Sequence, residues 1–188
     1  LPEHATVRVS GDSAPIKATL APLLDPPVEY VSVDAGNGVS VDGYAIMPPR
    51  LDRSRAYPVL VFVYGEPASQ TVTDTWGGAA GLFHRYLASL GYVVVSFDNS
   101  GTPAPRGRAW RKAIYGSVGV LSSVQQAQAL RSFKQSHAFV DLTRVAVWMC
   151  GEPLAETDRV CAAAWEPSRA QRPLAETARI PAEMLRAW

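Results

Sequence analysis

The stretch Arg144–Pro153, RVAVWMCGEP, has the pattern of a buried strand that leads into a sharp turn, where an enzyme can present a nucleophile. A serine nucleophile at such a turn requires Gly-x-Ser-x-Gly, because only small neighbours tolerate the strained backbone. No serine of the chain fits this pattern. The nearest match is YGSVG at Tyr115–Gly119, where Tyr115 replaces the first glycine and no strand precedes. We therefore interpret Ser117 as a loop serine.

Cys150 lies almost at this turn, so a cysteine nucleophile is an alternative. A reactive cysteine needs a base that generates the thiolate, and at this place it also needs a tight turn between glycines. Met149 precedes Cys150 and Glu152–Pro153 follow it, which disfavours such a turn. We interpret Cys150 as incidental. It and Cys161 are the two cysteines of the chain, and they do not define a redox environment.

A catalytic triad in the chain order serine, acid, histidine needs a histidine late in the sequence. All three histidines precede Trp148, whereas several acidic residues follow it. His84 falls in an expected helix, as a packed or surface residue, and His137 falls in the loop before an expected strand; the third is His4. A triad in this order cannot be assembled from the sequence. No cluster has metal-ligand spacing and no glycine loop has phosphate-binding spacing, so we expect no metal or cofactor.

Composition limits the partners of the protein. The chain has 188 residues, 47% of them hydrophobic and 19% charged, with a net charge of +1, which is typical of one soluble globular domain. The cluster RGRAWRK at Arg106–Lys112 is interpreted as a solvated loop and helix start rather than a nucleic-acid site. The apolar runs are too short for membrane insertion. Without a signal-peptide pattern, Leu1 is read as a cut end, a fragment or a mature start, and the compartment stays open between cytoplasmic and periplasmic or secreted.

Residues 28–148 alternate strand and helix patterns. VEYVSV and VSVDGYAIM flank AGNG at Ala35–Gly38 and predict a β-hairpin. Three apolar runs predict buried strands: PVLVFVY from Pro58, YVVVSFD from Tyr92 and RVAVW from Arg144. Such an alternation predicts a parallel α/β sheet.

Two helices are predicted between these strands. The first contains apolar residues at helical spacing and stops at Gly91; these residues are Leu82, Phe83, Tyr86, Leu87 and Leu90. The second is expected to begin with Ser122 or Ser123 as its cap. Its inward-facing residues are expected to be Val124, Ala127, Leu130 and Phe133.

The flanking regions differ from this centre. Residues 1–27 contain the alternating run ATVRVSG, a short apolar segment and a proline-bounded linker, which predict a strand and a connection. Residues 149–188 are rich in Ala, Arg, Pro and Glu, and repeat PLAETDRV as PLAETARI. Their prolines permit short helical pieces at best. The sequence therefore predicts an incomplete sheet with a hairpin before it and an irregular or helical tail after it.

Four segments together resemble a known family: YPVLVFVYGEPASQTV, GYVVVSFDNSGT, RGRAWRKAIYGSVGV and FVDLTRVAVW, in this order. They are similar to the catalytic domain of the prolyl oligopeptidase family, and within it to the dipeptidyl peptidase IV-like serine peptidases. The resemblance covers Val28–Trp148. It implies an α/β-hydrolase domain that cleaves peptides near their N-terminus, with a peptide substrate or ligand, and it implies that Leu1–Pro27 ends a β-propeller and links it to this domain.

The resemblance also implies roles for single residues. Tyr64 in VYGEP matches the tyrosine whose hydroxyl helps to form the oxyanion hole. The family's serine would fall at position 151, where this chain has Gly151. Ser100 stands where the family commonly has arginine, Glu66 stands where a second glycine is usual, and the helix after Ser122 lacks its usual acidic residues.

These departures predict a peptidase domain without nucleophile, acid or histidine, and thus without activity. The alternatives are a non-catalytic peptide-binding or assembly module and an esterase that works through Cys150.

Overall fold

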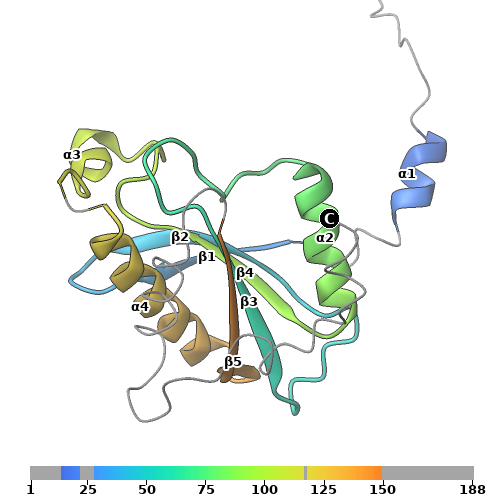
Figure 1. Ribbon diagram of the computed structural model, residues 1–188. Coiled ribbons are helices and arrows are strands. Elements are labelled where there is room, and N and C mark those ends of the chain that lie inside the picture. Colours follow the sequence, from blue (N-terminus) through green and yellow to red (C-terminus); the bar gives the residue numbers. More distant parts are fainter. Residues whose placement is uncertain (1–13, 22–27, 117, 150–188) are drawn as a thin grey trace, which may run out of the picture.

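The apolar runs of the sequence form one five-stranded sheet, in the order β1-β2-β4-β3-β5 (Figure 1). The computed structural model describes residues 14–21, 28–116 and 118–149. The strands are β1 (Glu29–Asp34), β2 (Ser40–Ile46), β3 (Tyr57–Val63), β4 (Val93–Asp98) and β5 (Val140–Met149). The helices are α1 (Ala14–Leu20), α2 (Gly78–Ser89), α3 (Gly107–Lys112) and α4 (Val120–Ser136).

The predicted hairpin is confirmed as β1 and β2, which pair antiparallel from Glu29↔Ala45 to Asp34↔Ser40. Its turn needs left-handed backbone at Gly36, Asn37 and Gly38, with φ of 90°, 53° and 75°. Glycine and asparagine adopt this conformation most readily, which explains the AGNG signal. β2 also pairs antiparallel with β4, so the hairpin belongs to the main sheet and the sheet is mixed.

The strands β4, β3 and β5 run parallel, as predicted. β3 pairs with β4 on one side and with β5 on the other. The chain passes from β3 to β4 through α2, and from β4 to β5 through α3 and α4. Parallel neighbours require such crossovers, and their carboxyl ends therefore lie at one edge of the sheet.

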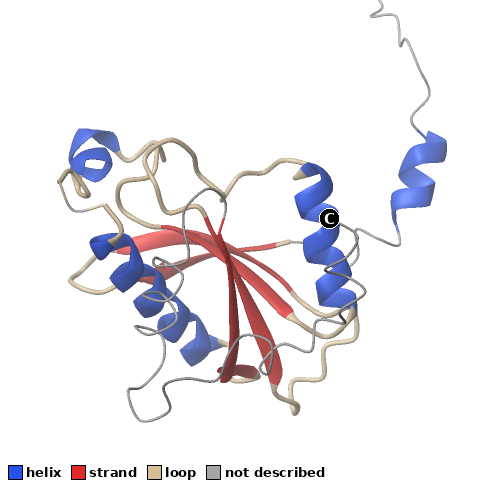
Figure 2. Cartoon of the chain, in the orientation of Figure 1, coloured by secondary structure: helices blue, strands red, loops and turns tan. Residues whose placement is uncertain are grey.

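The sheet is covered on both faces, by α4 on one side and α2 on the other (Figure 2). Alternate residues of one strand point to opposite faces, so Val59, Val61 and Val63 pack in the α4 layer while Leu60 packs in the α2 layer. Burial on both faces explains why β3 and the first half of β4, Val93–Val95, are continuously apolar instead of alternating.

The first residue of α4 and the set of its buried residues differ from the prediction. The helix begins at Val120 after Gly119, and neither Ser122 nor Ser123 caps it. Ser123 Oγ instead donates to the carbonyl of Gly119 at 2.6 Å. Both serines are buried, whereas Val124 is 54% exposed and not inward as predicted. The predicted inward residues Ala127, Leu130 and Phe133 are buried.

The inward face of α2 also differs from the expected one. Leu87 is buried as predicted, and His84 and Ala88 are buried beside it. Tyr86 and Leu90 are exposed, so the buried face of the helix is formed by His84, Leu87 and Ala88. The helix ends at the expected place, before Gly91 with φ of 94°.

Several predictions fall on residues outside the described ranges. These are the strand ATVRVSG, Ser117, Cys150, Gly151 and the tail beyond residue 149. α1 covers part of the expected apolar segment of residues 1–27, and none of its residues is buried. In the part of the chain that the structure describes, no helix is long and apolar enough to cross a membrane.

Candidate active site at the carboxyl ends of the strands

Tyr64 directly follows β3, and Asn99 directly follows β4. Since the two strands are parallel, both residues lie at the same edge of the sheet, where the strands have their carboxyl ends. In Figure 1 the carboxyl ends of β3 and β5 are at the top of the sheet. Ligands of open α/β sheets bind outside the carboxyl ends of the strands. Tyr64, the residue predicted from the sequence, is half-buried at this edge.

Gly65 makes the turn that follows Tyr64. Its φ of 74° lies in the left-handed region, where glycine is strongly favoured. A Cβ at this position would lie 3.3 Å from Val63 Cγ1 and 3.5 Å from Asn99 Oδ1. The chain therefore turns sharply away from β3 immediately after Tyr64, in close contact with the end of β4.

A buried amide network joins this turn to α4. Asn99 Nδ2 donates to the carbonyl of Gly65 at 3.1 Å and to the carbonyl of Ser100 at 2.8 Å. Asn99 Oδ1 accepts a hydrogen bond from Gln126 Nε2 at 2.9 Å, and Gln126 Nε2 also donates to the carbonyl of Phe97 at 2.6 Å. Asn99 and Gln126 are each only 1% exposed. Hydrogen bonds inside such a low-dielectric region are strong and fix one arrangement.

Ser100 and Gln125 form a second link between β4 and α4. The backbone N–H of Ser100 donates to Gln125 Oε1 at 2.8 Å, and Gln125 Nε2 donates to Ser100 Oγ at 3.1 Å. The family resemblance places arginine at position 100 and acidic residues on this helix. In this chain the contact between β4 and α4 is made by neutral groups.

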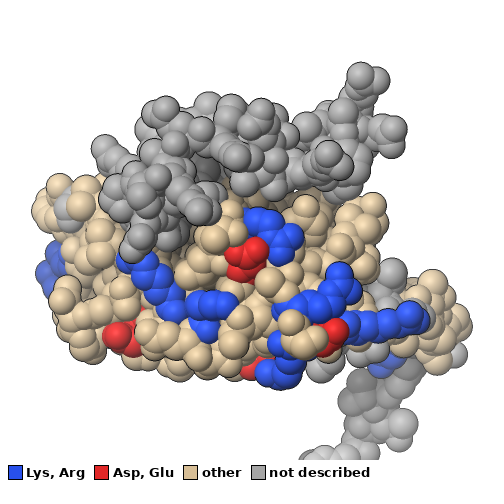
Figure 3. Space-filling model, turned by 90° about the horizontal axis from the view of Figure 1, so that it is seen from below, with Lys and Arg blue, Asp and Glu red and all other residues tan. Residues whose placement is uncertain are grey.

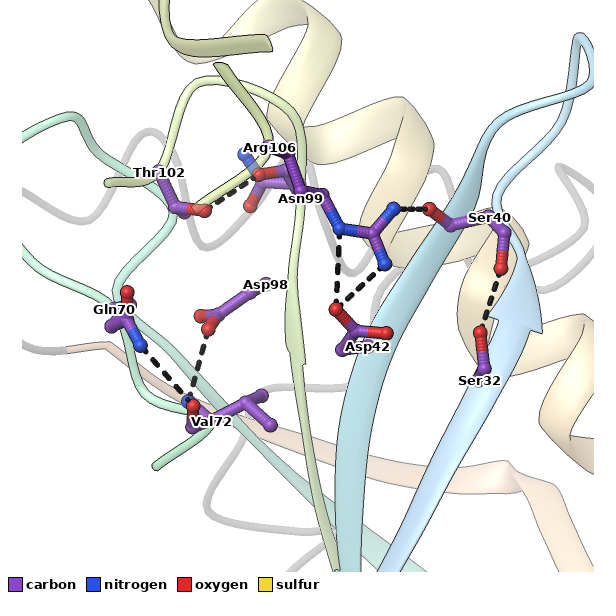
Figure 4. A network of polar contacts seen from close by, with 9 residues as sticks. All are labelled: Ser32, Ser40, Asp42, Gln70, Val72, Asp98, Asn99, Thr102 and Arg106. Atoms are coloured by element: carbon purple, nitrogen blue, oxygen red, sulfur yellow. Dashed lines mark hydrogen bonds and ion pairs between the residues drawn. The ribbon is translucent and has the colours of Figure 1, made fainter. Parts of the chain in front are cut away.

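Asp98 holds the loop that follows the Tyr64 turn. Its carboxylate accepts hydrogen bonds from Thr71 N at 2.9 Å, Thr71 Oγ1 at 3.1 Å and Val72 N at 3.1 Å. Figure 4 shows Asp98 directed at Val72, beside the Asn99–Thr102 turn. Burial raises the pKa of Asp98, and the hydrogen bonds from Thr71 and Val72 partly offset this rise.

His84 of α2 lies in an aromatic environment. Its ring packs 4.7 Å from Phe62 and 5.3 Å from Trp148, and the Tyr44 hydroxyl lies 3.4 Å from His84 Nδ1. Burial lowers the pKa of His84 to about 4 and raises that of Tyr44. A cavity of about 110 Å³ lies beside these residues, between β1, β2 and α2. At neutral pH His84 is therefore an uncharged core residue. Of the two predicted alternatives, a packed or a surface histidine, the packed one is confirmed.

The basic cluster RGRAWRK is tied to the hairpin. Arg106 Nη2 and Nε bind Asp42 Oδ2 at 2.6 and 3.2 Å, and Nη1 donates to the carbonyl of Ser40 at 2.7 Å (Figure 4). The Arg106 guanidinium also lies over the ring of Trp110 at 4.7 Å. This residue thus stabilises the contact between the loop after β4 and β2.

A larger groove lies at the opposite end of the sheet, where β3 begins. It has a volume of about 660 Å³ and is lined by Arg50, Arg55 and Arg144 among other residues. Lys and Arg side chains spread over this end of the molecule, seen from below in Figure 3. The groove lies away from the carboxyl ends of β3 and β4 and is not part of the Tyr64 site.

The sequence predicted Tyr64 but not the amide groups that hold the turn after it. Asn99, Gln125 and Gln126 were missed, although the DNS that follows a buried strand and the double glutamine of α4 are signals for a polar strand end. His137 caps α4 and stacks on Phe133 at 3.9 Å, with Nε2 3.4 Å from Glu29 Oε1. Among the described residues, no group of three or more His, Cys, Asp or Glu could hold a metal ion.

Comparison with known proteins agrees with this architecture. Residues 83–148 match the model of the prolyl oligopeptidase family. The chain is 32% identical to a probable dipeptidyl-aminopeptidase B of Emericella nidulans, over 76% of this chain and 15% of that protein. It is 33% identical to human dipeptidyl peptidase 8, over 73% of this chain and 16% of that protein.

The crystal structure of Porphyromonas gingivalis dipeptidyl peptidase 4 superposes with a TM-score of 0.63 and 33% identity, over 76% of this chain and 20% of that chain. The predicted resemblance and the α/β-hydrolase-like fold class are thus confirmed. The chain spans about a sixth of the length of the curated relatives named above. Tyr64 lies outside the segment that matches the family model.

Proposed function

Since this chain carries part of a prolyl oligopeptidase family domain, we propose that it holds the oxyanion side of a dipeptidyl peptidase-type site. We also propose that the chain of 188 residues does not hydrolyse peptides by itself. Residues 28–148 are the partial hydrolase domain of this proposal, residues 1–27 its connection to a propeller-like segment, and residues 149–188 an unrelated tail.

The position of Tyr64 carries the proposal. Tyr64 stands at the carboxyl end of β3 and is half-buried there. A hydroxyl donor at such an edge can meet the negative charge that develops on a carbonyl oxygen during acyl transfer. The same hydrogen bond, made to the carbonyl of an uncleaved peptide, contributes to binding alone.

The proposed inactivity rests on the groups that covalent catalysis would need. The family serine corresponds to Gly151, and no Gly-x-Ser-x-Gly occurs anywhere in the sequence. The two described histidines are buried in other contacts, His84 against Phe62 and His137 against Phe133. A serine peptidase that lacks its triad retains only the rate effects of binding and of the oxyanion hole.

Peptide binding without turnover is the second candidate function. It is favoured by the rigid network behind Tyr64, which holds the Gly65 turn in place without any contribution from a triad. A preorganised donor reduces the ordering cost of binding.

Titration with an X-Pro dipeptide, followed by NMR, tests both candidates together with a chromogenic X-Pro assay. The proposal expects saturable binding, weakened in Tyr64→Phe, and no hydrolysis above the buffer rate. Tyr115→Phe is the matched control, because Tyr115 is 87% exposed and lies in the segment after α3. Hydrolysis that is abolished by a single substitution in this chain would refute the inactivity, and binding that is equal in wild type and Tyr64→Phe would refute the site.

A further inference from the structure

We infer that Asn99 is a positioning residue that fixes the direction of the Tyr64 side chain, with Gln126 as its support. This inference rests on the proposed function, since it assigns Tyr64 a ligand to meet. It concerns the buried contact between the ends of β3 and β4.

The first step is the contact from Asn99 to the Tyr64 turn. Asn99 Nδ2 donates to the carbonyl of Gly65 at 3.1 Å, and the same nitrogen donates to the carbonyl of Ser100 at 2.8 Å. One amide group therefore joins the main chain after β3 to the main chain after β4. Because Asn99 is 1% exposed, water cannot replace this donor without a rearrangement.

The second step is the orientation of the Asn99 amide. Gln126 Nε2 donates to Asn99 Oδ1 at 2.9 Å and to the carbonyl of Phe97 at 2.6 Å. If the Gln126 amide were flipped, its oxygen would face two other oxygens. If the Asn99 amide were flipped, its oxygen would face the Gly65 carbonyl. Each amide thus has one favourable orientation, and Asn99 presents its donor to Gly65.

The third step leads from Gly65 to Tyr64. On its N-terminal side, Tyr64 follows the last paired residue of β3, Val63, which stands in register with Met149. On its C-terminal side, the Gly65 carbonyl is held by Asn99. The main chain is fixed on both sides of Tyr64, so the direction in which its side chain leaves the strand is fixed as well. A free Gly65 peptide would rotate easily, because glycine has few steric limits.

The substitution Asn99→Asp tests this role. It keeps the size of the side chain and the acceptor for Gln126, and it replaces the donor that faces Gly65 by an oxygen. Thr102→Val is the matched control, because it removes a buried hydrogen bond to the carbonyl of Asn99, at 3.0 Å, but none to Gly65.

The measurement is the backbone conformation of Tyr64 and Gly65, from NMR chemical shifts and scalar couplings on the labelled full chain, together with the affinity for the X-Pro dipeptide. We expect one backbone conformation in wild type and in Thr102→Val, and averaging in Asn99→Asp with binding weaker by about tenfold. A folded Asn99→Asp that keeps the single backbone conformation overturns the inference, and so does averaging in wild type. If Asn99→Asp does not fold, Gln126→Met is judged by the same criterion.

The two proposals fail separately. Failure of the wild-type chain to bind the dipeptide would refute the peptide site, while the backbone measurement would still decide the role of Asn99. Binding that weakens in Tyr64→Phe but not in Asn99→Asp would support the site and refute the positioning role.

Discussion

Gln125 of α4 contacts Ser100 at two points, accepting from its backbone N–H at 2.8 Å and donating to its hydroxyl at 3.1 Å. The family resemblance implies an arginine at position 100 and acidic residues on this helix. In this chain both sides of the contact are neutral, and the end of β4 remains joined to α4 without an ion pair.

The neutral pair predicts how the site responds to charge. Ser100→Arg places a guanidinium in a buried position without a counter-charge, and we expect a loss of ~3 kcal/mol or more in the free energy of unfolding. Adding Gln125→Glu supplies the counter-charge and recovers part of this loss. Urea denaturation of the single and double variants measures the difference.

Val124→Glu is the control for this experiment, because it adds the same charge to the same helix at an exposed position. If Ser100→Arg combined with Val124→Glu recovers as much stability as the combination with Gln125→Glu, the direct contact between positions 100 and 125 is not the cause.

The buried His84 predicts a loss of stability in acid. Burial lowers its folded-state pKa to about 4 from the ordinary 6.5, so the unfolded chain binds the proton more tightly. The contribution of neutral His84 is therefore complete above pH 6.5 and is lost as the pH falls towards 4. It amounts to at most ~3 kcal/mol. Thermal unfolding at several pH values in this window measures it.

The variant His84→Phe separates this effect from the other titrations. Phenylalanine does not titrate and can pack against Phe62 and Trp148, the two rings that His84 contacts. We expect the difference in stability between wild type and His84→Phe to change between pH 6.5 and 4. A difference that stays constant over this window would show that His84 is not a buried neutral group.

Close packing predicts that Gly43 of β2 cannot be replaced. A Cβ there would lie 2.5 Å from Phe97 Cδ1 and 2.8 Å from the carbonyl oxygen of Ser96, and both neighbours are buried. We expect Gly43→Ala to cost ~3 kcal/mol. Gly38→Ala is the comparison, because no atom lies within 4 Å of its Cβ and only the φ of 75° opposes it, at about 1 kcal/mol. Equal melting temperatures of the two variants would contradict this.

The edge of the sheet predicts marginal folding. Within the described residues β5 pairs only with β3, and Ala146, Val147 and Trp148 are partly exposed. An apolar edge strand promotes association. We expect the isolated chain to melt broadly at low temperature and to associate as its concentration rises, measured by calorimetry and light scattering. A sharp, concentration-independent transition at high temperature would contradict this expectation.

The succession of the main strands and helices along the chain could be predicted, because it rests on local signals in the sequence. The AGNG turn and the apolar runs at Val59–Val63 and Val93–Phe97 determine their own conformation. Which residues of α4 face the sheet could not be predicted in this way. Gln125 and the side-chain nitrogen of the inward Gln126 bond to groups at the end of β4, and these contacts exist only once the sheet has formed.

The candidate site shows the same division. Tyr64 could be placed at a strand end from the sequence, since it directly follows the apolar run of β3. The burial of His84 could not be predicted from the sequence. The rings that enclose it, Phe62 and Trp148, belong to two strands that are distant in the sequence. The role of Asn99 likewise depends on the parallel pairing of β3 with β4.

The most direct test of the proposed function is the reaction of the full chain with an active-site phosphonate directed at proline-specific serine peptidases, followed by intact mass measurement. Our account predicts an unmodified chain, because the sequence offers no serine in a nucleophile turn and places Gly151 at the corresponding position. A stoichiometric adduct on one specific serine would contradict it and would show that the chain forms a working nucleophile.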